Sequence, residues 1–366
     1  MAPLAAHALP LSSTARSCHP CAAGGRRPLR YRQGIRIVST SDGELADLAC
    51  SPFAAESLSD PEGLIVLTAP DGTVPEAVAV DRLASLPCIV IAVDRVPGDG
   101  PPLADATAEH GVASVDDMVA VAARNPVAAT SLVLCLRQAP PSLGRALVAE
   151  SAVYSLLQAG PEFARWRASR PARSGREETG PAVRMDRQGD RLALVLDRPH
   201  VRNALDRAMR DGLLEGLALA AADPSIGEVV LRGEGPSFCS GGDLDEFGTF
   251  ANPASAHLVR VAASIGRSID ALGARLVAEV HGPCAGSGVE LPAFARRVVA
   301  HPDFSAALPE VSLGLIPGAG GTASITRRIG RHRMALLALS GARIDAGTAL
   351  AWGLVDAISR EDGPST

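Results

Sequence analysis

Residues 277–291 read VAEVHGPCAGSGVEL, an apolar strand pattern that runs directly into a series of small residues. Glycine just after a strand lets bare backbone approach a ligand and adopt dihedral angles that other residues avoid. The N–H groups at the start of the next helix can point toward developing negative charge. The stretch predicts a strand whose end supplies backbone donors to a site or, more simply, a tight turn.

A second stretch of the same kind lies upstream. The β-rich run EVVLR (228–232) is followed by the loop SFCSGGDL (237–244). Glycine-rich loops that follow two successive strands predict an oxyanion hole built from backbone N–H groups. Taken singly, each loop is also explained as a turn.

The second half of the chain alternates strand and helix patterns. RLALVLD (191–197) opens it, and a helix capped at Asn203 is expected next, with apolar residues on one face. A helix over 254–272 and strands at 275–280 and 296–301 continue the pattern. Repeated βαβ units predict a largely parallel sheet.

The first half combines two short strands with helices. LIVLTA (64–69) and CIVIAV (88–93) are β-rich, and apolar residues at three- and four-residue spacing run from Val115 to Arg167. Residues 1–33 and 168–181 are rich in Pro, Gly, Ser and Arg without periodicity, which is typical of disordered or linker segments.

Composition describes a globular chain. Its 366 residues favour two domains, 47% of them are apolar and 20% charged, and no apolar run approaches the roughly 20 residues of a membrane span. A net charge of -5 and a pI near 5.9 give no general attraction to nucleic acid or an anionic membrane. All 35 basic residues are arginine.

The seven cysteines do not form a secreted disulfide pattern, which favours a cytoplasmic location. Cys18 and Cys21 form one CxxC, but a zinc site needs a second pair of ligands, so no metal is expected. The first acidic residue is Asp42, so the start resembles an organellar presequence in composition, although it lacks an amphipathic stripe. Disorder is the preferred interpretation.

Two glutamates accompany the glycine-rich segments. Glu290 is the penultimate residue of the stretch quoted first, and Glu310 lies 20 residues beyond it, in LPEVSLGLIPGAGGT (308–322). An acid/base pair needs two such groups to converge on one substrate. Spacing alone also allows a surface glutamate.

At this point the chain resembles the crotonase, or enoyl-CoA hydratase/isomerase, superfamily. Five fragments carry the resemblance in the expected order: RPHVRNAL (198–205), SFCSGGDL (237–244), VAEVHGPCAGSGVEL (277–291), LPEVSLGLIPGAGGT (308–322) and GTALAWGLVD (347–356). The resemblance implies an α/β fold with a ββα spiral core over residues 182–366.

It also implies a site for an acyl-CoA thioester. The thioester carbonyl would lie between the N–H groups of Gly242 and Ser287, Glu290 and Glu310 would act on a water, and the backbone of Gly318 would help to hold that water. The expected substrate-binding residues are Arg198, Ala204, Leu205, Ser240, Gly241, Asp243 and Leu244. Coenzyme A is then part of the substrate, no separate cofactor is expected, and a homo-oligomer, either trimer or hexamer, is expected as partner.

Ser287 departs from the family pattern, which commonly has glycine there. Its N–H survives, but its hydroxymethyl group must point away from the thioester. A hydrolase nucleophile is the alternative, yet Gly286-Ser287-Gly288 lacks the G-x-S-x-G spacing. Residues 318–323 also match GxGxxA, but no clean strand precedes them, and without lysine they form no P-loop.

The chain also ends soon after the last matching fragment, where family members usually continue with helices. Residues 125–171 resemble that helical tail, including Glu150 near its middle. We therefore predict that residues 34–170 are a degenerate crotonase-like α/β domain that lends its helices to the second half across a linker at 171–181.

Taken together, these patterns predict an enoyl-CoA hydratase. The alternatives are an isomerase on the same scaffold, which needs proton abstraction and return but no water, and a non-catalytic subunit that binds coenzyme A.

Overall fold

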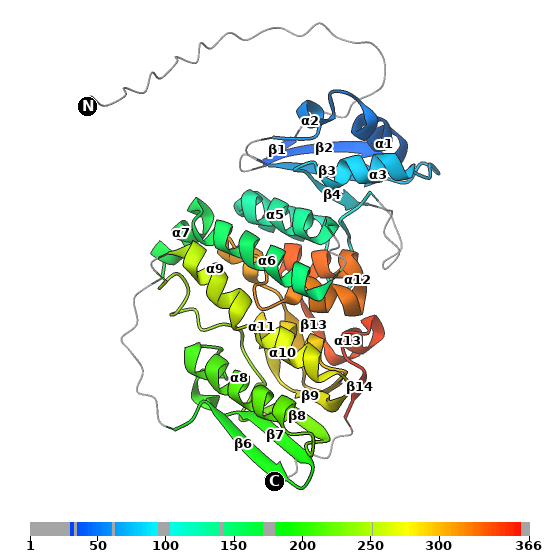
Figure 1. The fold of residues 1–366 in the computed structure, drawn as a ribbon. Coiled ribbons are helices and arrows are strands. Elements are labelled where there is room, and N and C mark those ends of the chain that lie inside the picture. The colour runs from blue at the N-terminus through cyan, green and yellow to red at the C-terminus, as the bar shows by residue number, and fades with distance from the viewer. Residues whose placement is uncertain are drawn as a thin grey trace, which may run out of the picture.

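The computed structural model describes residues 30–32, 35–60, 63–93, 103–138, 142–170, 180–250 and 252–359. Two sheets lie at opposite ends of the molecule, and helices from both halves of the chain are packed between them (Figure 1). The pair Cys18 and Cys21 and most of the two linker-like segments lie outside the described residues.

The first sheet is mainly parallel. Its order is β1 (Arg30–Arg32), β2 (Ile35–Ser41), β3 (Leu64–Ala69), β4 (Ile89–Ala92), β5 (Ala106–Thr107), and only β1 is antiparallel to its neighbour. Three helices accompany it: α1 (Asp42–Cys50), α2 (Ala54–Ser57) and α3 (Ala77–Ala84). The predicted strands at 64–69 and 88–93 are present as β3 and β4. Sequence reasoning missed β2, and it placed β1 in the disordered segment because composition does not reveal a pairing partner.

The first half contributes four more helices, α4 (Val115–Arg124), α5 (Pro126–Arg137), α6 (Leu143–Gln158) and α7 (Pro161–Ala168). Figure 1 shows α5 and α6 between the two sheets. Leu132 and Leu157 are buried in the same hydrophobic cluster as Leu194 and Leu337 of the second half. The two halves therefore share one core. Leu156 belongs to the apolar spacing noted over residues 115–167, which predicts a buried side chain, but it is 66% exposed.

The second half contains the larger sheet, which is parallel except at one edge, as predicted. Its order is β14 (Ala357–Ile358), β11 (Arg297–Ala300), β9 (Leu276–Val280), β8 (Glu228–Gly233), β7 (Arg191–Leu196), β6 (Val183–Gln188). A small sheet joins β10 (Pro283–Ala285), β12 (Ser305–Ala307) and β13 (Arg343–Asp345). The helices are α8 (Arg207–Ala222), α9 (Pro253–Ala262), α10 (Ile265–Leu272), α11 (Ser287–Glu290), α12 (Gly321–Ser340) and α13 (Ala346–Trp352), with 3₁₀ turns η1 (Pro199–Val201), η2 (Gly273–Arg275), η3 (Pro292–Phe294) and η4 (Glu310–Leu313).

The predicted helix cap at Asn203 is wrong. Helix α8 begins at Arg207, and Asp206 caps it by accepting a 2.8 Å hydrogen bond from the Met209 N–H. Asn203 has a positive φ of 54° and is fully buried, and its amide ties the preceding turn to the β8 loop through bonds to the carbonyls of Glu234 and Phe238. An Asn that precedes an apolar helical pattern can cap the helix or bond to distant backbone. Here its contacts with the carbonyls of Glu234 and Phe238 give it the second role.

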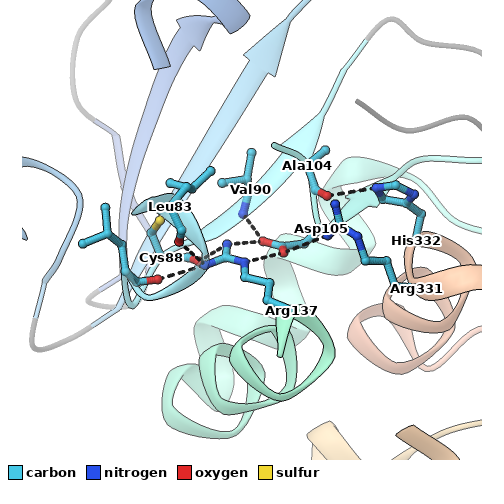
Figure 2. A network of polar contacts seen from close by, with 9 residues as sticks. Leu83, Cys88, Val90, Ala104, Asp105, Arg137, Arg331 and His332 are labelled. Atoms are coloured by element: carbon cyan, nitrogen blue, oxygen red, sulfur yellow. Dashed lines mark hydrogen bonds and ion pairs between the residues drawn. The ribbon is translucent and has the colours of Figure 1, made fainter. Parts of the chain in front are cut away.

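A buried ion pair joins the first sheet to the helices (Figure 2). Arg137 of α5 donates from Nε to Asp105 at 2.8 Å, and its other N–H groups bond to the carbonyls of Leu83, Leu86 and Cys88. From α12, the Arg331 guanidinium lies 3.8 Å from the same carboxylate, and His332 lies 3.0 Å from the Ala104 carbonyl. The network therefore links the first sheet to α5 of the first half and to α12 of the second half.

Within the described residues, no single helix is long and apolar enough to span a membrane. Helices α4 and α5 satisfy that test of length and composition only together, and they meet at a bend of 114°.

Candidate active site

A cavity of about 260 Å³ lies where the first half covers the second. Helix α6 forms one wall, helices α9 and α10 form another, and the loops that follow β8 and β9 close it. Apolar side chains such as Leu147, Phe247 and Ile265 line most of it, and Glu150, Glu290 and Glu310 are among the acidic residues that reach it. A mainly apolar cavity with a few convergent polar groups is the usual form of a small-molecule site.

The backbone donors predicted from the glycine-rich loops both line this cavity. Leu205 holds the β8 loop on either side of Gly242, since its N–H donates to the Gly241 carbonyl at 2.8 Å and its carbonyl accepts from Asp243 at 2.9 Å. Ser287 is the first residue of α11 and follows Gly286, whose φ is +49°. Neither the Gly242 nor the Ser287 N–H donates to another described residue, so both are available to a ligand.

The Ser287 side chain is buried beside the β8 loop. Its hydroxyl oxygen lies 4.0 Å from the Cys239 sulfur, and no described histidine hydrogen-bonds to it. This environment gives no support to the nucleophile alternative.

Glu290 stands at the end of α11 and is 2% exposed. One of its oxygens, Oε2, accepts hydrogen bonds from the N–H groups of Ala319 at 2.8 Å and Gly321 at 2.9 Å. These amides belong to the turn that starts α12, where backbone N–H groups lack helical partners. Glu290 is therefore fixed in place by the Gly-rich turn.

Glu310 begins η4 and is 7% exposed. Its Oε2 atom is buried and has no hydrogen-bond partner among the described residues. Its Oε1 atom lies against the backbone before Ser287, because a methyl group placed on Gly286 would come within 2.4 Å of it. Glu310 thus offers an oxygen without a protein partner beside the two free amides.

Glu150, from the first half, is a further buried carboxyl group of the cavity and is 2% exposed. Its oxygens accept from the N–H groups of Gly320 at 2.7 Å and Thr322 at 2.9 Å, and from the Thr322 hydroxyl at 2.6 Å. The sequence analysis identified Glu150 only as part of a helical tail. Its spacing in α6 carries no sign that it meets a turn 170 residues away.

Burial raises the pKa of all three carboxyl groups. The pKa of Glu310 rises to about 7, mainly through desolvation with a further contribution from the charge of Glu150. The pKa of Glu290 rises well above its usual value through desolvation first and the charges of Glu310 and Glu150 next, while its two amide bonds oppose the shift. Glu150 follows the same pattern, with desolvation opposed by Thr322 and Gly320. Carboxyl groups with raised pKa values can carry protons near neutral pH.

Tyr154 and Arg260 complete the wall formed by α6 and α9. The Tyr154 ring packs on Gly318, since a methyl group placed there would come within 2.4 Å of the ring. The Arg260 guanidinium lies 4.8 Å from the centre of that ring and donates to Ser151 Oγ at 3.2 Å. Burial raises the pKa of the Tyr154 hydroxyl, so it stays protonated.

The structure separates the predicted site residues into two groups. Those that line the cavity are Leu205, Gly242, Asp243, Ser287, Glu290, Glu310 and Gly318. Those that do not line it are Arg198, Ala204, Ser240, Gly241 and Leu244. Arg198 is 7% exposed and forms an ion pair with Asp206, so it braces the start of α8. Gly241 has a φ of +102° and shapes the loop that presents Gly242.

In the described part of the chain, no group of three or more His, Cys, Asp or Glu side chains is arranged to hold a metal ion.

Known proteins match the second half. The family model for enoyl-CoA hydratase/isomerase matches residues 189–363. The 2,3-dehydroadipyl-CoA hydratase of Escherichia coli is 35% identical over 178 residues, which are 49% of this chain and 69% of that enzyme. The chain belongs to the enoyl-CoA hydratase/isomerase family. The family match begins within the β6–β7 hairpin, so both glycine-rich loops and the pair Glu290 and Glu310 lie inside it.

Other family members resemble this chain over similar lengths. The enoyl-CoA isomerase/hydratase fer4 of Mycosarcoma maydis is 33% identical over 175 residues, 45% of this chain and 64% of its own. A crystal structure of an enoyl-CoA hydratase from Thermoplasma volcanium is 32% identical, with a TM-score of 0.46 over 49% of this chain and 72% of that one. The matched segment thus spans about two thirds of these relatives.

Proposed function

We propose that this protein is an enoyl-CoA hydratase that adds water reversibly to the 2,3-double bond of a 2-enoyl-CoA thioester. The observation that carries the proposal is the placement of Glu290 and Glu310 in one cavity with two unbonded backbone amides. The family supports an acyl-CoA substrate, and relatives named as hydratases support the reaction type.

In this proposal the backbone amides stabilise the charge that develops on the substrate. The N–H groups of Gly242 and Ser287 donate to the thioester oxygen as the 2,3-double bond is attacked and an enolate forms. Donors that are fixed before the reaction stabilise such a charge without reorganising. The Gly318 backbone and the carboxyl groups would hold the water that attacks C3.

The two glutamates then share the proton transfers. One carboxylate removes a proton from the water as its oxygen bonds to C3, and the other carboxylic acid gives a proton to C2. The raised pKa values of Glu290 and Glu310 support this division, because one member of the pair can be protonated while the other is ionised. Asp243 and Leu205, at the cavity edge, are proposed to contact the substrate.

Isomerisation of the double bond is the second candidate. It needs one group to remove a proton and return it, and Glu310, with an oxygen free of protein partners, satisfies that requirement alone. The relative named as an isomerase/hydratase is consistent with it.

We propose a homo-oligomeric, cytoplasmic enzyme with no cofactor other than the coenzyme A of its substrate. Light scattering of the purified protein tests the oligomer, with a trimer or hexamer as the expected result.

A direct assay tests the reaction. Crotonyl-CoA and a longer 2-enoyl-CoA are offered to the full chain, and loss of the enoyl absorbance is followed. A hydratase should reduce the enoyl absorbance of at least one of the two substrates. Activity only on a 3-enoyl-CoA, seen as a gain of enoyl absorbance, supports isomerisation. Binding of acetoacetyl-CoA without turnover of any enoyl-CoA supports the non-catalytic alternative.

A further inference from the structure

The turn before α12 is held by two carboxylates from opposite halves of the chain. The N–H groups of Ala319 and Gly321 donate to Glu290, while those of Gly320 and Thr322 donate to Glu150. Successive amides therefore alternate between the two partners. Gly320 is the N-cap of α12 and Gly321 and Thr322 are its first two residues, so their N–H groups have no acceptor inside the helix, and Ala319 directly precedes them.

We propose that Glu150 is a positioning residue of the active site, contributed by the first half of the chain: it holds the 318–322 turn so that Glu290 and the Gly318 backbone keep their reactive geometry. This inference rests on the function proposed above. It assigns to the first half a part in the chemistry that family membership, matched only over the second half, does not assign.

The geometry makes the position of Glu290 depend on Glu150. Glu290 bonds to the turn through Oε2, and the N–H groups of Gly320 and Thr322 in the same turn donate to Glu150. Glutamine in place of Glu150 has a single acceptor oxygen, so one of the buried N–H groups of Gly320 and Thr322 would face the amide NH2 group and lose its acceptor, and the turn must move to find another. Glu290 and Gly318 would move with it, because both are attached to the same few residues.

Charge is the second route of influence. The groups that face Glu150 are Glu290 on α11, Glu310 on η4, Arg260 on α9, Tyr154 on its own helix and Cys135 on α5. The negative charge of Glu150 raises the pKa of both Glu290 and Glu310. Its removal therefore lowers both pKa values, so the pH–rate profile should move to lower pH.

A purely structural cap is available as a matched control. Glu162, on α7, is 6% exposed and accepts from the N–H groups of Val127 at 2.8 Å and Ala128 at 2.9 Å, at the start of α5. It is a buried carboxylate of the first half that binds two amides of a helix N-terminus, as Glu150 does. It does not line the cavity.

The experiment compares Glu150→Gln with Glu162→Gln in the full chain. For each variant, kcat and KM for crotonyl-CoA are measured from pH 5 to 9, together with the melting temperature. We expect Glu150→Gln to lower kcat by about 10- to 10²-fold, the effect of a small misplacement of reacting groups, with a smaller change in KM and a profile moved to lower pH. Glu162→Gln should lower the melting temperature alone.

Three results would overturn the assignment. These are an unchanged kcat and pH profile in Glu150→Gln, a loss matched by Glu162→Gln, or a rise in KM alone. If Glu150→Gln does not fold, Thr322→Val replaces it. That variant keeps the carboxylate but removes one donor that lowers its pKa, so less charge faces the pair and the same shift is expected at smaller amplitude; no shift would refute the role.

The positioning role of Glu150 can be tested separately from the proposed enzyme function. If the wild-type protein turns over no enoyl-CoA, the function fails, and the positioning role is tested by NMR titration of glutamate side-chain carbons labelled with ¹³C. The two perturbed carboxyl resonances that remain in Glu150→Gln should titrate at lower pH than in the wild type. If these resonances titrate at the same pH in the variant and in the wild type, the proposed role of Glu150 is refuted, whatever the enzyme activity.

Discussion

The two parallel sheets end in loops that use their polar groups in opposite ways. After β2 and β3, the groups satisfy one another: Thr68 donates to the buried Asp42 at 2.7 Å, and Asp71 accepts from the Gly43 and Thr73 N–H groups, each at 2.9 Å. Beyond β8 and β9, the Gly242 and Ser287 amides bond to no described residue, and neither does one oxygen of Glu310, which follows β12 of the small sheet. A similar strand arrangement thus yields a closed loop cluster in one half and a cavity with available groups in the other.

This difference shows where binding capacity lies. A buried polar group without a partner is costly in a folded protein, so such groups persist where a ligand satisfies them. The polar groups in the loops of the first sheet, such as Asp42 and Asp71, bond to one another and to nearby backbone, so they stabilise the fold. The first half of the chain contributes to the site through helix α6 instead, whose Glu150 and Tyr154 line the cavity.

The largest expected effect comes from separating the two regions. A fragment 181–366 should aggregate or lose its cooperative melting transition, because the apolar surface that packs on Leu132, Leu147 and Leu157 would be exposed. Burial of each such side chain contributes about 1.5–3 kcal/mol, against a typical domain stability of about 5–15 kcal/mol. Calorimetry measures this, and addition of residues 34–170 in trans should restore part of the transition. A soluble, cooperatively folding and fully active fragment would show that the halves are independent.

Removing the acid/base groups should come next in size. Glu290→Gln and Glu310→Gln should each lower kcat by about 10²–10⁴-fold, because an amide keeps the shape but cannot transfer the proton, and binding of the CoA ester should change little. Asp42→Asn, in the closed cluster of the first sheet, is the matched control and should affect stability alone. Steady-state kinetics with crotonyl-CoA decide the outcome. Unchanged turnover in either glutamine variant removes that residue from the mechanism, and isomerase activity that survives Glu290→Gln favours the second candidate function.

The backbone donor should have a slightly smaller effect. Gly242→Pro deletes the N–H and should lower kcat by about 10²–10³-fold. Any side chain here meets the Phe247 ring, since a methyl group would come within 2.6 Å of it. Gly242→Ala therefore controls for crowding while it keeps the N–H, and circular dichroism reports whether both variants fold. A folded and fully active proline variant would refute the donor assignment.

Because Glu310 is buried in the cavity with a raised pKa, the free energy of unfolding should depend on pH. Glu310 has a folded pKa of about 7 against an ordinary value of 4.5. A raised pKa means that the group favours folding below pH 4.5 and loses that contribution as the pH rises through about 7. Glu310→Gln stays neutral, so its stability relative to wild type should increase across this window, by about 1–3 kcal/mol. Denaturant melts at pH 5 and pH 8 check it, and equal differences at both values would contradict the raised pKa.

The smallest effect is expected for Ser287→Gly. The backbone N–H is retained and the hydroxyl faces Cys239 rather than a charged group, so kcat should change by no more than a few-fold. A loss comparable to that of Gly242→Pro would instead give the hydroxyl a direct role, which the kinetics of Ser287→Ala would confirm.

The sequence by itself determined most of the strands of the second half and the residue types that line its cavity. Strands such as β3 and β8 follow from unbroken apolar runs, because a strand buried on both faces needs no polar alternation. The glycine-rich loops and the two glutamates were recognisable because backbone donors and acid/base groups require those residue types.

Only the tertiary structure decided which groups meet. It gave the cap of α8 to Asp206 and buried Arg198 in an ion pair with it. It also brought Glu150 to a turn 170 residues away along the chain. Periodicity reports which face of a helix is apolar, but the partner of a buried polar group is set by packing between distant segments. For that reason the sequence predicted that the first half lends helices to the second, but it did not predict the contact of Glu150 with the turn before α12.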